Sequence, residues 1–231
     1  SIAHAGNDHR LGANEAPPAI ISVFIGEAMT NLLEQIADGQ YTTDDEVKRA
    51  IDLIAKLPNL EMDNTDRNRT SPFAFTGNKF EIRAVGSSQN CAGPMAVMNT
   101  MMGLQLMDFK KTVDERMESG MAKEEAVLSV LKSYIMAAKP ILFEGNNYSN
   151  EWREEAARRG LNNFANTPEA LDVLGTDLGK SFYSKAGIMG TDELEAYFAV
   201  QLHIYCTKLN IEAKSLEEMI HSMVMLSLIH I

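Results

Sequence analysis

The stretch RNRTSPFAFTGNKFEIRAV, residues 67–85, concentrates positive charge in a chain that is acidic overall. The 231 residues contain 21 Lys+Arg against 32 Asp+Glu, which gives a net charge of −11. Within the stretch the balance is reversed, because four cations accompany a single acid. These residues are Arg67, Arg69, Lys79, Arg83 and Glu81. The question is what an acidic protein would bind with such a cluster.

The end of this stretch, residues 80–85, alternates like a β-strand, after a segment at 59–79 whose Pro, Gly, Asn and Asp residues predict a loop. Side chains two residues apart leave the same face of a strand, so Lys79, Glu81 and Arg83 share one face. The opposite face, which we expect to meet a core, consists of Phe80, Ile82 and Ala84. Taken alone, the pattern favours a solvated charge ladder worth about 0.2–1 kcal/mol per pair.

A functional interpretation of the same face assigns each group a chemical task. Lysine is a compact cation suited to a phosphate oxygen, whereas the planar fork of arginine suits a carboxylate held by two hydrogen bonds. A glutamate between them can bind a hard cation such as Mg²⁺. Phosphoryl transfer needs positioning and charge stabilisation, which these groups supply. The sequence has no Walker-type glycine loop, so a P-loop nucleotide site is excluded.

Composition limits the classes of function that remain. A hydrophobic content of 45% with 23% charged residues is ordinary for a globular protein. The net negative charge argues against a nucleic-acid or anionic-membrane surface, and no apolar run is long enough to cross a bilayer. The first residues show no secretion signal, so we expect a cytoplasmic protein. Cys91 and Cys206 have no metal-type spacing and are predicted to be buried free thiols.

The remaining segments predict an α+β chain with a mainly helical second part. A helix is expected from the apolar positions at 20–36, ending near Gly39, and a capping box at 43–46 predicts a short helix to about Leu57. Beyond Pro94 the pattern is helical almost throughout. The predicted helices are 94–118, 122–138, one after Ser149, one with Thr167 as N-cap, one of about four turns from Thr191, and one from about Ser215.

Two segments together resemble a known family. HRLGANEAPPAII, residues 9–21, followed by DRNRTSPFAFTGNKFEIRAVGSSQN, residues 66–90, is similar to the C-terminal half of a glutamine synthetase catalytic domain. The wording TSPFAFTGNKFE is typical of the large bacterial type III branch. The similarity continues more loosely through EGNNYSNEWREEAARRGL, NTPEAL and LNIEAKSLEEM to about residue 224.

The resemblance implies roles in binding the substrates L-glutamate and ammonium. The Arg that precedes the E-A-P segment contacts glutamate in such enzymes, and here it is Arg10. The Glu of E-A-P belongs to a flap and helps to form the ammonium pocket, which makes Glu15 the implied catalytic residue. Glu15 also has a simpler interpretation, as an acid favoured at a helix N-terminus. The Arg of the closing E-[FIV]-R strand binds glutamate, and here it is Arg83.

The resemblance also implies roles toward ATP and a divalent metal, Mg²⁺ or Mn²⁺. Arg69, the second Arg of R-N-R-[ST], contacts ATP phosphate, and Lys79 takes the place of a basic residue near the nucleotide. Glu81 is the implied metal ligand. Position 74 is Ala where shorter relatives carry a third Arg, which puts nucleotide contacts around that loop in doubt. His4 and His9 match no metal-binding His of the family, and we interpret them as loop residues.

The implied activity is ATP-dependent ligation of ammonia to L-glutamate through a γ-glutamyl phosphate, in a homo-oligomeric ring. We expect residues 1–93 to be the C-terminal half of the catalytic domain, 94–225 a helical region and 226–231, LSLIHI, a non-native tail. The family's other metal carboxylates lie upstream, so the chain is expected to be a fragment without activity of its own. The alternatives are a non-catalytic helical assembly module and another ATP-dependent carboxylate–amine ligase.

Overall fold

The computed structural model describes residues 19–38, 71–76, 79–83 and 90–229. These residues fall into two compact units, one within 9–165 and the other within 166–231, and each is described by itself. The boundaries predicted from the sequence at 93 and 225 concern the family's regions and remain a prediction.

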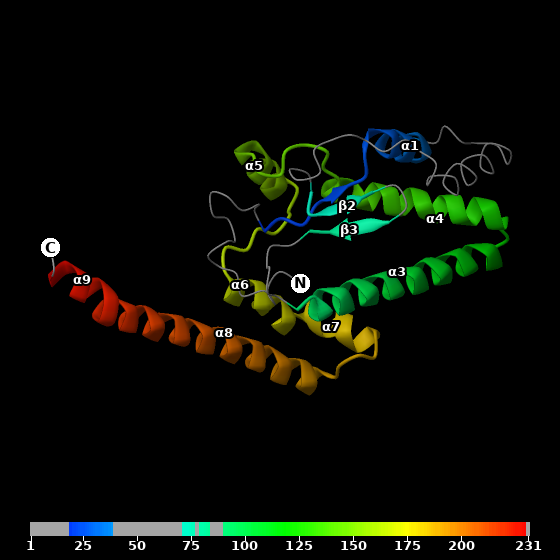
Figure 1. Cartoon of the computed structure of the whole chain (residues 1–231). Helices are drawn as coiled ribbons and strands as arrows, with labels where there is room; N and C mark the ends of the chain where they lie inside the picture. The colour runs from blue at the N-terminus through cyan, green and yellow to red at the C-terminus, as the bar shows by residue number, and fades with distance from the viewer. Residues whose placement is uncertain (1–18, 39–70, 77–78, 84–89, 230–231) are drawn as a thin grey trace. The chain divides into compact units, whose positions relative to one another are not determined.

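A three-stranded sheet forms the centre of the first unit (Figure 1). The strands are β1 (Val23–Phe24), β2 (Phe73–Phe75) and β3 (Phe80–Ile82), in the order β1-β2-β3. β1 pairs with β2 in parallel and β2 pairs with β3 antiparallel, so Phe24, Ala74 and Glu81 form one row across the sheet. The Thr76 amide donates to the Lys79 carbonyl at 2.9 Å and closes the β2–β3 hairpin.

The helix predicted from position 20 begins later than expected. Residues up to Ile25 are extended and contain β1, and α1 occupies Glu27–Ala37 only. A short apolar run such as residues 19–25 has no periodicity that separates a buried strand from a helix. Pairing with β2, about fifty residues away, decides between the two, and Gly26 at φ 84° makes the turn into α1.

The predicted loop at 59–79 was also partly wrong, because it contains β2. The strand predicted at 80–85 is confirmed for the described residues as β3. Phe80, expected to face a core, is 47% exposed. Its ring stacks on Phe73 at 4.9 Å and contacts Phe75 at 5.2 Å, which covers one ring face. Strand alternation fixes the side of the sheet for a residue and says nothing about what covers that side.

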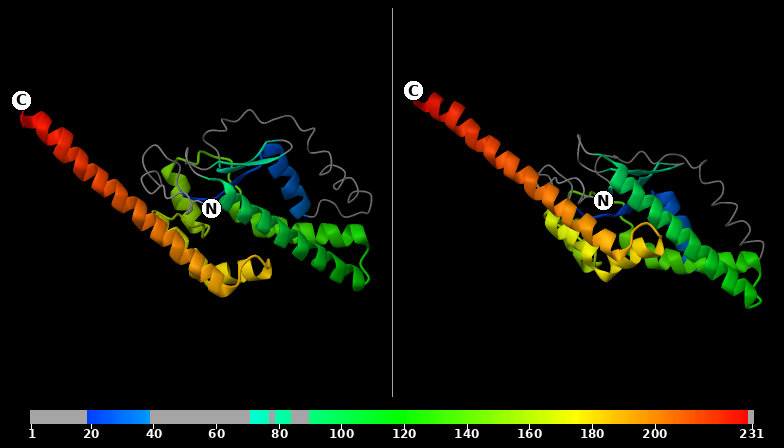
Figure 2. Two further views of the ribbon diagram at one scale, coloured as in Figure 1. Left: turned by 60° about the horizontal axis from the view of Figure 1, so that its bottom comes forward. Right: turned by 90° about the horizontal axis from the view of Figure 1, so that it is seen from below.

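Two long helices form a hairpin beside the sheet, and both confirm the predicted segments. They are α3 (Ala92–Glu118) and α4 (Lys123–Ala138), and all views show them side by side (Figures 1 and 2). Gly120 at φ 98° ends the first helix, as glycine does at a left-handed position. Val113, Ala126 and Val130 are buried between them. Burial of such a seam supplies most of the stability of paired helices.

The opposite side of α4 carries α1. Leu32 and Ile36 from α1 pack against Leu128 from α4, with Met29 and Ile135 at the edge. These positions follow the three-to-four-residue spacing of one helix face, which is the pattern visible in the sequence. The contact fixes α1, and with it the end of β1, on the helical hairpin.

α5 (Asn150–Arg158) follows a short 3₁₀ turn, Lys139–Ile141, and an extended segment. The predicted start after Ser149 is confirmed, since the Ser149 hydroxyl accepts from the Trp152 amide. The Trp152 ring is 1% exposed and stacks on Phe143 at 3.7 Å. The Arg159 guanidinium lies 5.4 Å from the Trp152 ring centroid. This stack buries the inner face of α5.

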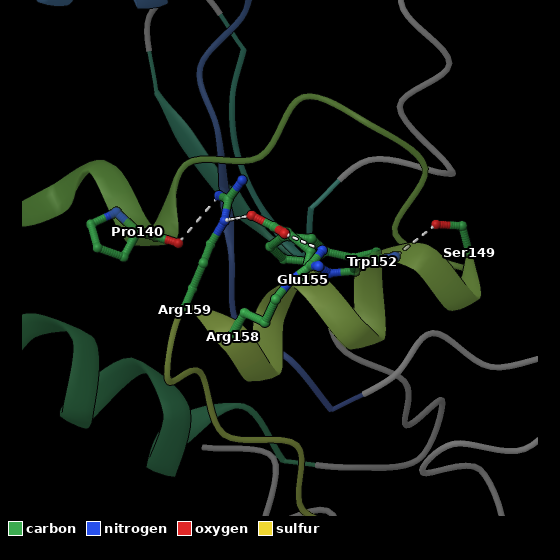
Figure 3. A network of polar contacts seen from close by, with 6 residues as sticks. All are labelled: Pro140, Ser149, Trp152, Glu155, Arg158 and Arg159. Atoms are coloured by element: carbon green, nitrogen blue, oxygen red, sulfur yellow. Dashed lines mark hydrogen bonds and ion pairs between the residues drawn. The ribbon is translucent and has the colours of Figure 1, made fainter.

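Arg159 also connects α5 to the preceding segment (Figure 3). Its guanidinium donates to the carbonyls of Pro140 and Leu142, and its Nε donates to Glu155 at 2.9 Å. Hydrogen bonds from Arg159, and then from Arg158, lower the pKa of the Glu155 carboxyl. The segment before α5 is therefore held by hydrogen bonds to its backbone carbonyls and by the stacking of Phe143 on Trp152.

The second unit is helical in its described residues. Its elements are α6 (Thr167–Asp172), a 3₁₀ turn at Val173–Gly175, α7 (Asp177–Lys185), α8 (Thr191–Met219), a π-helical turn at Ile220–Val224 and α9 (Met225–Ile229). Leu171 and Leu194 are buried, as is most of Tyr183, and burial raises the pKa of the Tyr183 hydroxyl.

Two predicted boundaries in this unit were wrong. The N-cap of α6 is Asn166, whose side chain accepts from the Glu169 amide, and Thr167 is the first helical residue. The helix from Thr191 starts as predicted, but it runs through Ser215 without a break and continues into α9 (Figure 2). No glycine or proline lies between 191 and 229, so nothing in the sequence ends the helix.

Two further expectations can be compared with the structure. Both cysteines are free, as predicted, but Cys91 and Cys206 are exposed and not buried. No helix among the described residues combines the length and the apolarity that a membrane span requires.

Candidate functional site

The three charged side chains predicted to share a face of β3 do lie together. Lys79 Nζ is 3.6 Å from Glu81 Oε1, and Arg83 is 3.8 Å from Glu81 Oε2. The Arg83 amide donates to the Pro72 carbonyl at 2.6 Å, which continues the β2–β3 pairing past the last strand residue. The carboxylate thus lies between two cations on a backbone that the sheet holds in place.

The energy of this arrangement is small. The Lys79 side chain is 65% exposed and that of Glu81 is 35% exposed, so solvent screens their attraction. Ion pairs of this kind contribute roughly 0–1 kcal/mol to stability. Neither distance is a short hydrogen bond, so the oxygens of Glu81 keep capacity for another partner. The Lys79–Glu81 pair therefore contributes little to folding.

The other residues predicted for the site lie outside the described part of the chain. These are Arg10, Glu15 and Arg69. The described residues beside them can be placed. Ile20, five positions after Glu15, is fully buried against Trp152 and Ala156. Ser71, two positions after Arg69, is also fully buried.

A buried series of hydrogen bonds connects the segments that contain Ile20 and Ser71. The Ser22 hydroxyl donates to the Ser71 hydroxyl oxygen at 2.7 Å, and the Ser71 hydroxyl donates to the Phe143 carbonyl at 3.0 Å. Ser22 and Ser71 are 49 positions apart, and Ser71 and Phe143 are 72 apart. Because buried hydroxyls are costly when unpaired, these hydrogen bonds fix the relative positions of the segments that contain Ser22, Ser71 and Phe143.

Of the metal ligands that the family resemblance implies, the described residues include Glu81. Mg²⁺ takes six oxygen ligands in near-octahedral geometry, some of them from water and phosphate. Glu81 offers a partly exposed carboxylate beside cations that suit phosphate, which fits one corner of such a site. No group of three or more candidate ligands occurs in the ranges that the structure describes. The remaining protein ligands have to come from elsewhere in the protein.

The residues that join this sheet to segments distant in the chain were not predicted from the sequence. Ser22, Ser71 and Glu144 each connect segments that are distant in the chain. Ser71 and Glu144 lie within the quoted segments, TSPFAF and EGNNYSN. Nothing local distinguishes a buried serine or a glutamate that bonds a distant turn from its exposed counterparts, so their tasks were not predictable.

Comparison with known proteins finds similarity of this chain to one family. Residues 126–230 match the family model described as "Glutamine synthetase C-terminal domain". The predicted resemblance to glutamine synthetase is therefore confirmed, from a segment that includes none of the charged residues Lys79, Glu81 and Arg83.

Three relatives that are named glutamine synthetase align with nearly the whole of this chain. The chain is 45% identical over 223 residues to a glutamine synthetase from Bacteroides fragilis (strain YCH46). It is 38% identical over 228 residues to a type-3 glutamine synthetase from Dictyostelium discoideum, and 39% identical over 226 residues to a glutamine synthetase from Butyrivibrio fibrisolvens. These alignments include 95–97% of this chain but only 30–31% of the relatives' length.

Proposed function

We propose that this chain is part of an enzyme that joins ammonia to L-glutamate at the expense of ATP and forms L-glutamine. The observation that carries the proposal is the Lys79–Glu81–Arg83 face of β3, in a chain similar along its length to glutamine synthetases. In this mechanism the glutamate side-chain carboxylate attacks the γ-phosphorus of ATP, the bond to the β–γ bridging oxygen breaks and ADP leaves. Ammonia then displaces phosphate from the resulting acyl phosphate.

Each charged residue has one task in this scheme. Arg83, together with Arg10, orients glutamate, because a guanidinium can hold a carboxylate through two parallel hydrogen bonds. Lys79 and Arg69 neutralise phosphate charge. Glu81 supplies one oxygen ligand to a Mg²⁺ or Mn²⁺ ion. When bound, this ion would stabilise charge at the transferring phosphoryl group. Glu15 serves the second step, as acceptor of the proton that ammonium must lose.

The protein's assembly is part of the same proposal. The chain supplies one carboxylate ligand in its described residues, and we propose that the other ligands come from the rest of the polypeptide and from a neighbouring copy in a homo-oligomeric ring. The active enzyme is then the oligomer of the full-length protein, and the substrates are L-glutamate, ammonium and ATP.

The direct test is glutamine formation by the full-length protein that carries this segment. Purified protein is incubated with ATP, L-glutamate, ammonium and Mg²⁺, and glutamine and phosphate are quantified. We expect equal amounts of both products and no glutamine when any one component is omitted. Phosphate release that does not depend on glutamate, without glutamine, would contradict the proposal. Replacement of ammonium by other amines distinguishes a different carboxylate–amine ligase.

A further inference from the structure

Glu144 belongs to the EGNNYSN segment, which has no place in the mechanism above. One oxygen of its side chain, Oε1, accepts three hydrogen bonds, two from the turn between β1 and α1 and one from the first turns of α1. The donors are the Ile25 amide at 3.3 Å, the Gly26 amide at 3.2 Å and the Thr30 hydroxyl at 3.0 Å. The sequence separation is 114–119 residues.

This contact joins the start of α1 to a distant segment of the chain. The N-cap of α1 is Gly26, which has no side chain to accept from the first amides of the helix. Unpaired amides at a helix N-terminus are stabilised by an acceptor oxygen, and a carboxylate there also interacts favourably with the helix dipole. Glu144 places its carboxylate beside this N-terminus, and its bonds hold the Ile25 and Gly26 amides directly before the first helical residue and the Thr30 hydroxyl within the helix.

The backbone around Glu144 is joined to β1 as well. Leu142 pairs with Val23 in parallel, and the Phe143 amide donates to the Val23 carbonyl at 3.0 Å. The Phe143 carbonyl accepts from Ser71, directly before β2. Residues 142–144 therefore extend the sheet by one more extended segment beside β1. We call these three residues the strap.

The strap is connected to the charged face of β3 through one row of paired residues in the sheet. Glu144 holds Ile25, which directly follows Phe24. Phe24 is paired with Ala74, and Ala74 is paired with Glu81. Phe24 and Ala74 are both buried, so this row has little freedom to adjust on its own. A shift of β1 is expected to move β2 and β3 with it.

We propose that Glu144 is a positioning residue for the Glu81 carboxylate and the Arg83 guanidinium, acting through the strap, β1 and β2. This proposal rests on the function proposed above. It assigns a task to the helical C-terminal domain, which contributes the residue that sets the geometry of the metal and glutamate contacts. Outer-shell partners that orient metal-ligating side chains typically change metal affinity or activity about 10–100-fold when removed.

The test compares variants of the full-length protein. Glu144→Ala removes the acceptor, whereas Glu144→Gln keeps a carbonyl oxygen at the same reach. Val130→Ala is the control for lost stability, because it opens a cavity in the α3–α4 seam away from the strap. The measurements are Mn²⁺ binding in the absence of substrates, from the electron paramagnetic resonance signal of free Mn²⁺, and KM for glutamate.

We expect Glu144→Ala to weaken Mn²⁺ binding and to raise KM for glutamate by roughly 10-fold or more. Glu144→Gln should restore most of both values, and Val130→Ala should change neither despite a lower melting temperature. If Glu144→Ala does not fold, Thr30→Ala removes one of the three donors and should shift the same constants in the same direction by less.

Two outcomes separate the proposals. Unchanged Mn²⁺ binding and KM in a folded Glu144→Ala protein, or in Thr30→Ala if the former does not fold, would show that the strap only supports stability. A wild-type protein that makes no glutamine, but whose Mn²⁺ binding still depends on Glu144, would contradict the proposed function and leave the positioning role in place.

Discussion

At the residue scale, the charged face of β3 carries the roles that we propose for two substrates. Lys79, Glu81 and Arg83 alternate with apolar residues, so a single backbone segment brings two cations and a carboxylate together. Positions on the same face of a strand are about 7 Å apart along the backbone. The ends of these side chains approach more closely, at 3.6 and 3.8 Å.

Arg83 is expected to act on glutamate more than on ATP. In the full-length enzyme, Arg83→Lys keeps the charge but loses the planar fork, so we expect a loss of about 1.5–3 kcal/mol in glutamate use. The measurement is kcat/KM for each substrate with the other saturating. The control is Lys79→Arg, which should affect ATP first. Equal weakening of both substrates by Arg83→Lys would remove the assigned role.

Glu15 should separate the two half-reactions. Phosphoryl transfer to glutamate needs the cations and the metal, all of which survive Glu15→Ala, whereas capture and deprotonation of ammonium need a nearby carboxylate. We expect continued glutamate-dependent phosphate release, with glutamine formation lower by ~10²-fold or more. Both products are measured in one assay of the full-length enzyme. Loss of both to the same extent would place Glu15 in the first step or in folding.

At the element scale, the strap pairs with β1, and α5 packs against the strap through Trp152. Trp152 is packed by Phe143, Ile20 and Arg159, which lie in three different segments of the chain. Arg159 also donates to backbone carbonyls on either side of Ile141 (Figure 3). One aromatic side chain thus stabilises both the strap and the entry into β1.

Trp152→Ala is expected to loosen the strap and β1 together. Removal of a fully buried Trp side chain costs about 3–5 kcal/mol, because it leaves a cavity and removes a stacked partner. The measurement is amide hydrogen exchange of Phe143, whose amide bonds to Val23, as a function of denaturant. Leu178→Ala is the control, since Leu178 is 75% exposed, and it should change the exchange free energy by less than about 0.5 kcal/mol. Unchanged protection in Trp152→Ala would show that the strap is held by its hydrogen bonds alone.

At the scale of the whole molecule, the proposed metal site needs more ligands than the described residues offer. Glu81 is the one proposed ligand that the structure describes, and no group of three or more candidate ligands forms among the described residues. The chain spans less than a third of the length of the relatives that it matches. The proposed function therefore includes ligands from the rest of the protein.

Residues 1–231 alone are expected to make no glutamine. One carboxylate cannot hold a divalent ion in the geometry that phosphoryl transfer requires, so the first step should not proceed. The measurement is glutamine formed from ATP, glutamate and ammonium, compared with a sample without protein. The full-length enzyme in the same buffer is the positive control. Synthesis by residues 1–231 above background would show that the chain is a complete catalyst.

The sequence by itself determined the features that depend on local order. The periodicity of 94–118 and 122–138, the alternation of 79–83 and the Ser149 cap were all visible in the chain, because propensity and side-chain period act over a few residues. The glutamine synthetase resemblance was visible for the same reason, since it rests on continuous segments. The tertiary structure decided what depends on partners distant in the sequence. Residues 23–24 became a strand because β2 pairs with them, and Glu144 came to bond the Gly26 amide at the start of α1 across more than a hundred residues. A local pattern cannot show which distant acceptor or strand will satisfy a backbone group, because that choice is made only when the chain is packed.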